Sequence, residues 1–97
     1  MIKLYRLTTG EDVIGTFEEE TDLFEHIKKP YVLIPMQGQP GQPMQIGFHS
    51  YLPYSKDEIV KIKKVNIICD SNPSENIIEA YQKNTGAIVT PKKSIIT

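Results

Sequence analysis

The sequence predicts a small all-β domain that carries one short helix near its C-terminus, so that by content it is a small α+β protein. Apolar and polar residues alternate with the period of two that is typical of half-buried strands. The alternating segments are short, and turn residues separate them, among which are seven prolines and six glycines. Helical spacing replaces the alternation only once, after residue 72. The 97 residues form a single domain, with a barrel over about 1–70, a helix over about 73–85 and a tail over 87–97.

Composition and charge place the chain among globular domains. Hydrophobic residues make up 39% and charged residues 24%, and no apolar run is long enough to span a membrane. The single cysteine excludes an intrachain disulfide and favours a cytoplasmic location. The formal net charge of −1 is a poor match for a protein that coats long nucleic acids. Residues 1–27 nevertheless carry seven acids and two bases, whereas residues 28–97 carry five acids and nine bases.

The first two expected strands form a hairpin. Residues 2–7 alternate as a strand, and residues 12–19 read as its return strand. Between them, Gly10 can take the positive φ of a tight turn. Gly15 lies inside the second strand, where a glycine indicates sharp bending or the close approach of another backbone.

The middle of the chain predicts two further strands. The third covers residues 23–28 and resumes after Pro30 at 31–34. The Gln, Gly and Pro residues of 37–43 indicate an exposed loop. Residues 43–52 then show the cleanest alternation in the chain.

The last strand region comprises residues 58–62 and 65–69, as one bent strand or two short ones. Five or six short strands with a glycine in the second suggest a small, strongly bent barrel or a sandwich. An open sheet would expose its edges, so we expect closure or edge pairing with a neighbouring subunit. The expected inward side chains in this region are Val60, Ile62, Val65, Ile67 and Cys69.

A helix follows over about 73–85. Asn72 is the expected N-cap, Pro73 suits the first helical position, and Glu75 has the spacing of a capping box. Gly86 is the expected left-handed stop. The tail over 87–97 leaves room for one more short strand.

The segment from Leu7 to Phe17 has the form L-x-x-G-x-x-V-x-G-x-F and resembles the first conserved segment of Sm and Sm-like (LSm) proteins. The resemblance implies that Gly10 and Gly15 shape the first hairpin of a strongly bent five-stranded barrel. It also implies a cyclic homo-oligomer whose subunits join by strand pairing. The opening residues, the segment Tyr51–Tyr54 and the trailing helix are similar to small phage-borne members of cyanophage type, although the usual N-terminal helix of Sm proteins is absent.

The same resemblance implies a site for single-stranded RNA. The family's first RNA-binding loop reads D-x-aromatic/apolar-x-N, and this chain has Asp22, Phe24 and His26 at the matching places. The second loop reads I-R-G, and here Lys63 and Lys64 replace the last two residues. Phe24 would stack a base, His26 would contact its edge, Asp22 would orient the loop, and the two lysines would attract phosphate.

Each of these residues also has a structural interpretation. Phe24 would be core or interface, His26 a surface histidine, and the basic run of Lys61, Lys63 and Lys64 a solvated face. The altered second loop and the net charge of −1 favour a second hypothesis, in which the domain is a structural or scaffolding protein of a phage that binds phage or host proteins and no nucleic acid. A third is recognition of an extended peptide at a barrel edge.

No motif in the sequence indicates catalysis, and we expect no enzymatic activity and no cofactor. His26, His49 and Cys69 make no zinc pattern, so no metal is expected, and residues 18–20 read as a solvated acidic turn. The expected partners are further copies of the chain, single-stranded RNA and phage or host proteins, with no membrane. If the protein is phage-encoded, its expected location is the host cell cytoplasm.

Overall fold

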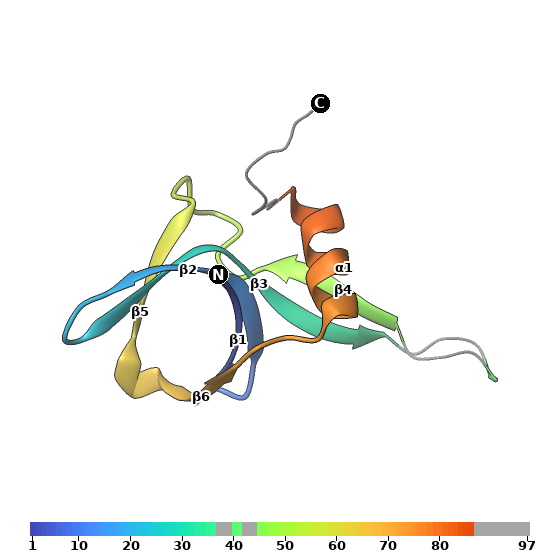
Figure 1. The fold of residues 1–97 in the computed structure, drawn as a ribbon, viewed down its shortest axis with the longest axis horizontal. Helices are drawn as coiled ribbons and strands as arrows, with labels where there is room; N and C mark the ends of the chain where they lie inside the picture. Colours follow the sequence, from blue (N-terminus) through green and yellow to red (C-terminus); the bar gives the residue numbers. More distant parts are fainter. Residues whose placement is uncertain (37–39, 42–44, 87–97) are drawn as a thin grey trace.

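The computed structural model describes residues 1–36, 40–41 and 45–86. Within these ranges the chain forms six strands, one turn of 3₁₀-helix (η1) and one α-helix (Figure 1). The elements are β1 (Ile2–Leu7), β2 (Asp12–Glu20), β3 (Phe24–Met36), β4 (Gln45–Ser50), β5 (Ile59–Lys63), η1 (Lys64–Asn66), β6 (Ile67–Ser71) and α1 (Glu75–Thr85).

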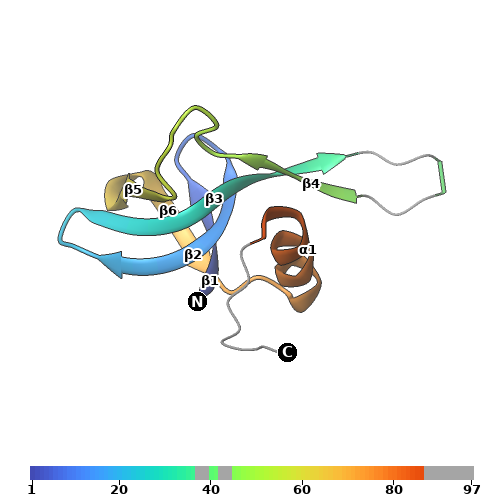
Figure 2. The same cartoon turned by 90° about the horizontal axis from the view of Figure 1, so that it is seen from above.

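All strand pairs are antiparallel, and the strand order is β4-β3-β2-β1-β6. The long strand β3 has two partners on its other edge. Its first part pairs with β5, whereas its second part pairs with β4 in a ribbon that extends away from the body (Figure 2). The prediction of a β-rich domain with one C-terminal helix is therefore confirmed.

The strands β1, β2, β3, β5 and β6 curve around a common centre in Figure 1, but the sheet is not closed. The last two strands are joined through η1, and no pairing between β5 and β6 exists among the described residues. The expected five-stranded barrel is thus found as an open, six-stranded sheet. The sixth strand arises because η1 divides the last strand region into two short strands, of which β5 pairs with β3 and β6 pairs with β1.

A β-bulge produces the bend. Ile14 lies opposite Tyr31, and Thr16 lies opposite Lys28, so that Lys29 and the following Pro30 together oppose Gly15. Lys29 has a φ of 50°, which is rare for a residue other than glycine. Proline has no N–H to donate to the ladder, and it is tolerated at such a bulge because the ladder is interrupted there. A Cβ on Gly15 would collide with the Ile27 side chain and lie 3.3 Å from the Lys28 carbonyl oxygen.

Because the sheet is bent, it buries apolar side chains on both faces. The inner cluster contains Tyr5, Leu7, Val13, Ile27 and Ile62. The outer cluster lies beneath α1, where Ile2, Ile14 and Tyr81 are buried with partly buried neighbours that include Tyr31 and Phe48. The Tyr81 ring makes an edge contact with the Tyr31 ring at a centroid distance of 6.1 Å.

The helix begins two residues later than predicted. Its N-cap is Ser74, not Asn72, and the Ser74 hydroxyl accepts a 3.4 Å hydrogen bond from the Ile77 N–H. The predicted stop is confirmed, since Gly86 is left-handed with a φ of 72°. In the described ranges no helix has the length and apolar character needed to cross a membrane.

Two expected inward residues face solvent. Val65 is 77% exposed, and Cys69 is exposed as well. The alternation assumed through 65–69 fails because η1 interrupts the strand and the β1–β6 register shifts between Arg6 and Leu7. The expected tail strand in 87–97 and most of the loop over 37–43 lie outside the described residues.

Replacing Gly15 with alanine is expected to destabilise the fold by about 1–3 kcal/mol, because the new methyl group would press against β3 in a packed interior. Gly47→Ala is the matched control, because its Cβ would meet the flexible Met36 side chain at 3.1 Å. Urea unfolding measures the free energy of unfolding of both variants and of the wild type. Equal destabilisation at the two positions would contradict the close approach at the bulge.

Tyr81→Phe is expected to cost about 1 kcal/mol, because the Tyr81 hydroxyl donates a 2.7 Å hydrogen bond to the Lys29 carbonyl. Burial raises the pKa of Tyr81 to about 12, whereas the pKa of a tyrosine in the unfolded chain is about 10. The unfolded chain therefore loses this proton first. The stability linked to Tyr81 is complete below the unfolded pKa and falls as pH rises through the folded pKa.

The stability difference between wild type and Tyr81→Phe should therefore narrow above about pH 10 in denaturant titrations. Tyr54→Phe is the control. Because Tyr54 is 100% exposed, this substitution should leave the free energy of unfolding unchanged at every pH. A difference that stays constant up to about pH 12 would contradict a buried, hydrogen-bonded Tyr81 hydroxyl.

Candidate functional site

The pairing of β3 with β5 builds the candidate site. Phe24 lies directly opposite Lys63, and His26 lies directly opposite Lys61. Residues opposite each other in an antiparallel pair share a face, with Cβ atoms about 5 Å apart. An aromatic ring, an imidazole and two ammonium groups are therefore gathered on one face of this ribbon, which we call the basic ribbon.

The turn from β2 to β3 is set by Thr21. Its hydroxyl accepts a 3.2 Å hydrogen bond from the Phe24 N–H, and its own N–H donates to the Phe24 carbonyl at 2.8 Å. Across the turn, the Lys64 N–H donates to the Leu23 carbonyl at 2.9 Å. These bonds place the two expected loops side by side.

Ion pairs divide the lysines into two groups. The Lys64 ammonium lies 2.7 Å from a Glu20 carboxylate oxygen, and His26 Nδ1 lies 3.2 Å from Glu19. In the described part of the chain, Lys61 and Lys63 have no acidic partner within ion-pair distance. The positive charge of the basic ribbon that is open to a ligand therefore comes from these two side chains.

The five residues predicted for the site are thus brought together unequally. Phe24, His26 and Lys63 share the basic ribbon, whereas Lys64 sits at its end and is paired with Glu20. Asp22 is exposed in the turn, where Thr21 makes the hydrogen bonds that orient the loop. The predicted turn residue Gly10 has a φ of 97°, and Gly15 faces the bulge.

A slot of about 450 Å³ lies along the edge of β5 that does not pair with β3. It is bounded by the turn after β1, by the segment after β4 and by η1. We call it the β5 slot, and its lining comprises Leu7, Thr8, Thr9, Phe24, Tyr51, Leu52, Val60, Lys61, Ile62, Lys63 and Asn66. Sequence reasoning did not assign Thr8, Thr9, Tyr51, Leu52 or Asn66 to a site. Tyr51 and Leu52 belong to the segment that supports the family resemblance, but local patterns gave no indication that they face β5.

The interior beneath the basic ribbon contains one polar pair. The Tyr5 hydroxyl and one Glu25 carboxylate oxygen are both buried, and neither has a hydrogen-bond partner in the described residues. Burial, and then the negative charge of Glu25, raise the pKa of Tyr5 above its ordinary value. An ordinary tyrosine is already neutral at physiological pH, and the raised pKa extends the neutral form of Tyr5 to more alkaline pH.

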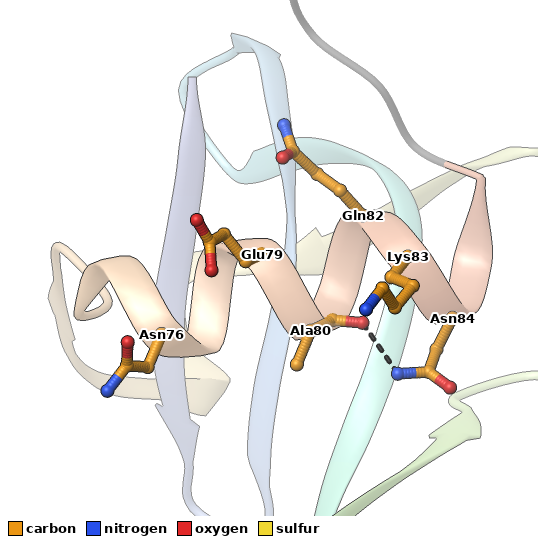
Figure 3. A pocket seen from close by; sticks show the side chains of 6 residues that line it. All are labelled: Asn76, Glu79, Ala80, Gln82, Lys83 and Asn84. Atoms are coloured by element: carbon orange, nitrogen blue, oxygen red, sulfur yellow. Dashed lines mark hydrogen bonds between the residues drawn. The ribbon is translucent and has the colours of Figure 1, made fainter.

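A second hollow, of about 740 Å³, lies along the outward side of α1 (Figure 3). Its described lining comes from this one helix: Asn76, Glu79, Ala80, Gln82, Lys83 and Asn84. The Asn84 side chain donates a 2.7 Å hydrogen bond to the Ala80 carbonyl. These described residues combine one acid, one base, one alanine and three amides, and none of them is aromatic or strongly apolar. This part of the hollow therefore offers less binding chemistry than the β5 slot.

Within the described ranges, no group of three or more His, Cys, Asp or Glu side chains could hold a metal ion. Comparison of the sequence with models of known families and with curated proteins gives no match. The functional interpretation therefore depends on the residues themselves.

Replacing Lys64 with glutamine is expected to raise the pKa of Glu20, because the Lys64 hydrogen bond and charge hold that pKa below its ordinary value. Carbon-detected NMR titration of the side-chain carboxyl groups measures it. Asp12, whose pKa is lowered by its hydrogen bond from Arg6, is the internal control and should not move. A Glu20 pKa unchanged by the substitution would show that the ion pair does not form in solution.

Proposed function

We propose that this protein is a non-catalytic, Sm-like module that forms rings and binds single-stranded RNA. The observation that carries the proposal is the basic ribbon, in which Phe24 and Lys63 lie directly opposite each other beside the pair of His26 and Lys61. Sites for single-stranded nucleic acid combine cations that contact the backbone with aromatic rings on which bases stack. The ribbon supplies both components on one face.

The charges of the ribbon support binding despite the net charge of −1. Acidic residues at the end of β2 pair with Lys64 and His26, while Lys61 and Lys63 remain available for phosphate. Since the attraction is local, the overall charge does not determine it. Phe24 is half-buried and lies across the β3–β5 pair from Lys63, where its ring would stack a base next to these lysines.

The sheet supports self-assembly. β4 and β6 lie at opposite ends of the strand order, and each leaves one edge unpaired within the described ranges. Exposed edges tend to pair with another chain. A contact between two different edges is heterologous, and repetition of such a contact closes into a ring when the rotation allows. The exposed side chains of Ile46 on β4 and Ile68 on β6 would be buried in that contact.

A structural role without RNA is the second candidate, and exposed apolar side chains favour it. Val65, Tyr54 and Leu23 are all strongly exposed, and such residues are common where proteins dock. Under this alternative the protein copurifies with a phage or host protein and does not bind RNA.

The test of RNA binding is fluorescence anisotropy with single-stranded oligo-U and oligo-A across a range of salt concentrations. Affinity should fall with salt, and the double variant Lys61→Gln with Lys63→Gln should make the slope less steep by about 0.7 for each phosphate that the protein no longer neutralises. Phe24→Ala should weaken binding by about 1–3 kcal/mol at every salt concentration. Lys83→Gln removes one positive charge on α1, away from the basic ribbon, and is the control that should bind as wild type does.

Light scattering on the same samples measures the solution mass with and without RNA. A closed ring gives one discrete multiple of the chain mass. A monomer that binds neither oligo-U nor oligo-A would overturn the proposed function. Copurification with a stable protein partner, without binding of RNA, would favour the structural role.

A further inference from the structure

We propose that the β5 slot binds one unstacked nucleobase of a nucleotide whose phosphate lies on Lys61 and Lys63. This inference rests on the proposed function and deepens it, because it makes a recessed slot, and not only the open face of the ribbon, the place where a base is recognised. The slot, at about 450 Å³, lies within the volume range of about 300–1,000 Å³ that is usual for small-molecule sites.

The apolar part of the slot suits a flat ring. Leu7 and Ile62 are only 2% and 5% exposed and form a rigid part of the lining, while Val60 and Tyr51 are half-buried. Phe24 also contributes to the lining. Aromatic and apolar side chains around a recess favour a planar aromatic group, which stacks against them and is removed from water.

The polar part of the slot suits the edge of a base. The Thr8 hydroxyl and the Asn66 side-chain amide make no hydrogen bond to any other described residue. An amide offers both a donor and an acceptor, as the edge of a nucleobase does, and a hydroxyl can do either. The Asn66 backbone carbonyl accepts a 2.8 Å hydrogen bond from the Thr8 N–H, so the two side chains are held at neighbouring positions.

The charges around the β5 slot determine the orientation in which a charged ligand binds. Lys61 and Lys63 line the slot on the β5 side without an acidic partner in the described residues. Near Tyr51, the charge of Glu11 raises the pKa of the Tyr51 hydroxyl after the larger effect of burial, and Glu11 accepts a 2.5 Å hydrogen bond from Thr9. An anionic group is therefore favoured beside the lysines and disfavoured beside Tyr51. A nucleotide, which has a flat neutral base and a phosphate at one end, matches this distribution.

The direct experiment is an NMR titration of the ¹⁵N-labelled full chain with AMP, GMP, CMP and UMP. Ribose 5-phosphate and inorganic phosphate are the controls that lack a base. At least one nucleotide should shift the backbone signals of Thr8, Tyr51 and Asn66, whereas the two controls should shift only signals near the lysines. Equal shifts with ribose 5-phosphate, or no shift at all in the slot, would overturn the inference.

Two variants test the slot itself. Asn66→Asp keeps the side-chain shape but adds a negative charge at the rim, and it should weaken nucleotide binding by about tenfold. Asn76→Asp makes the same change on α1 and should have no effect. Thr8→Phe should fill the slot and abolish the shifts at Tyr51, and thermal unfolding of each variant confirms that it is folded.

Oligo-RNA binding is measured in parallel on the wild-type chain. If oligo-RNA binds with the expected salt dependence but mononucleotides leave the slot unchanged, the slot inference is wrong and the proposed function stands. If neither binds, both are wrong. If a short peptide with a free C-terminal carboxylate shifts the slot signals and no nucleotide does, the slot recognises peptides, and the inference is overturned in favour of that class.

Discussion

The bulge of Lys29 and Pro30 opposite Gly15 is the constraint on which the other parts of the structure depend. Three separate segments attach to it by hydrogen bonds. The Tyr81 hydroxyl of α1 donates to the Lys29 carbonyl at 2.7 Å, the Lys29 N–H donates to the Glu58 carbonyl at 2.7 Å, and the Tyr51 N–H donates to the Pro30 carbonyl at 3.0 Å. The helix α1, the segment before β5 and the segment after β4 are thus all held in place at one bend in β3. A positive φ at a lysine is unfavourable, and such a conformation persists only when the surrounding structure determines it.

The bend also determines where the candidate site lies. Because β3 changes direction at the bulge, its first part pairs with β5 and its second part pairs with β4. The first pairing sets Phe24 beside Lys63, and the bond from Tyr51 to the bulge brings the segment after β4 to the opposite side of the slot. The open seam between β5 and β6, which a closed sheet would fill with hydrogen bonds, is where the slot is found.

Much of the fold follows from local patterns. The hairpin of β1 and β2 is predicted nearly residue for residue, because alternation and a turn glycine are both local signals. Phe24, His26 and Lys63 are predicted as site residues through the family resemblance, and their period-two spacing on an extended strand places Phe24 and His26 on one face. The exposure of Cys69 and the pairing of Lys64 with Glu20 were not predictable in this way. Each depends on a register shift or on a partner more than forty residues away.

The sequence alone therefore determined the element types, the turn at Gly10, the close approach at Gly15 and the helix stop at Gly86, because each is encoded by residues within a few positions of one another. Only the tertiary structure decided that β3 serves two partners, that the sheet stays open between β5 and β6, and that Thr8, Tyr51 and Asn66 line one slot. These features depend on strand register across the bulge. Local periodicity does not encode that register, because one additional residue in a strand changes which side chains share a face.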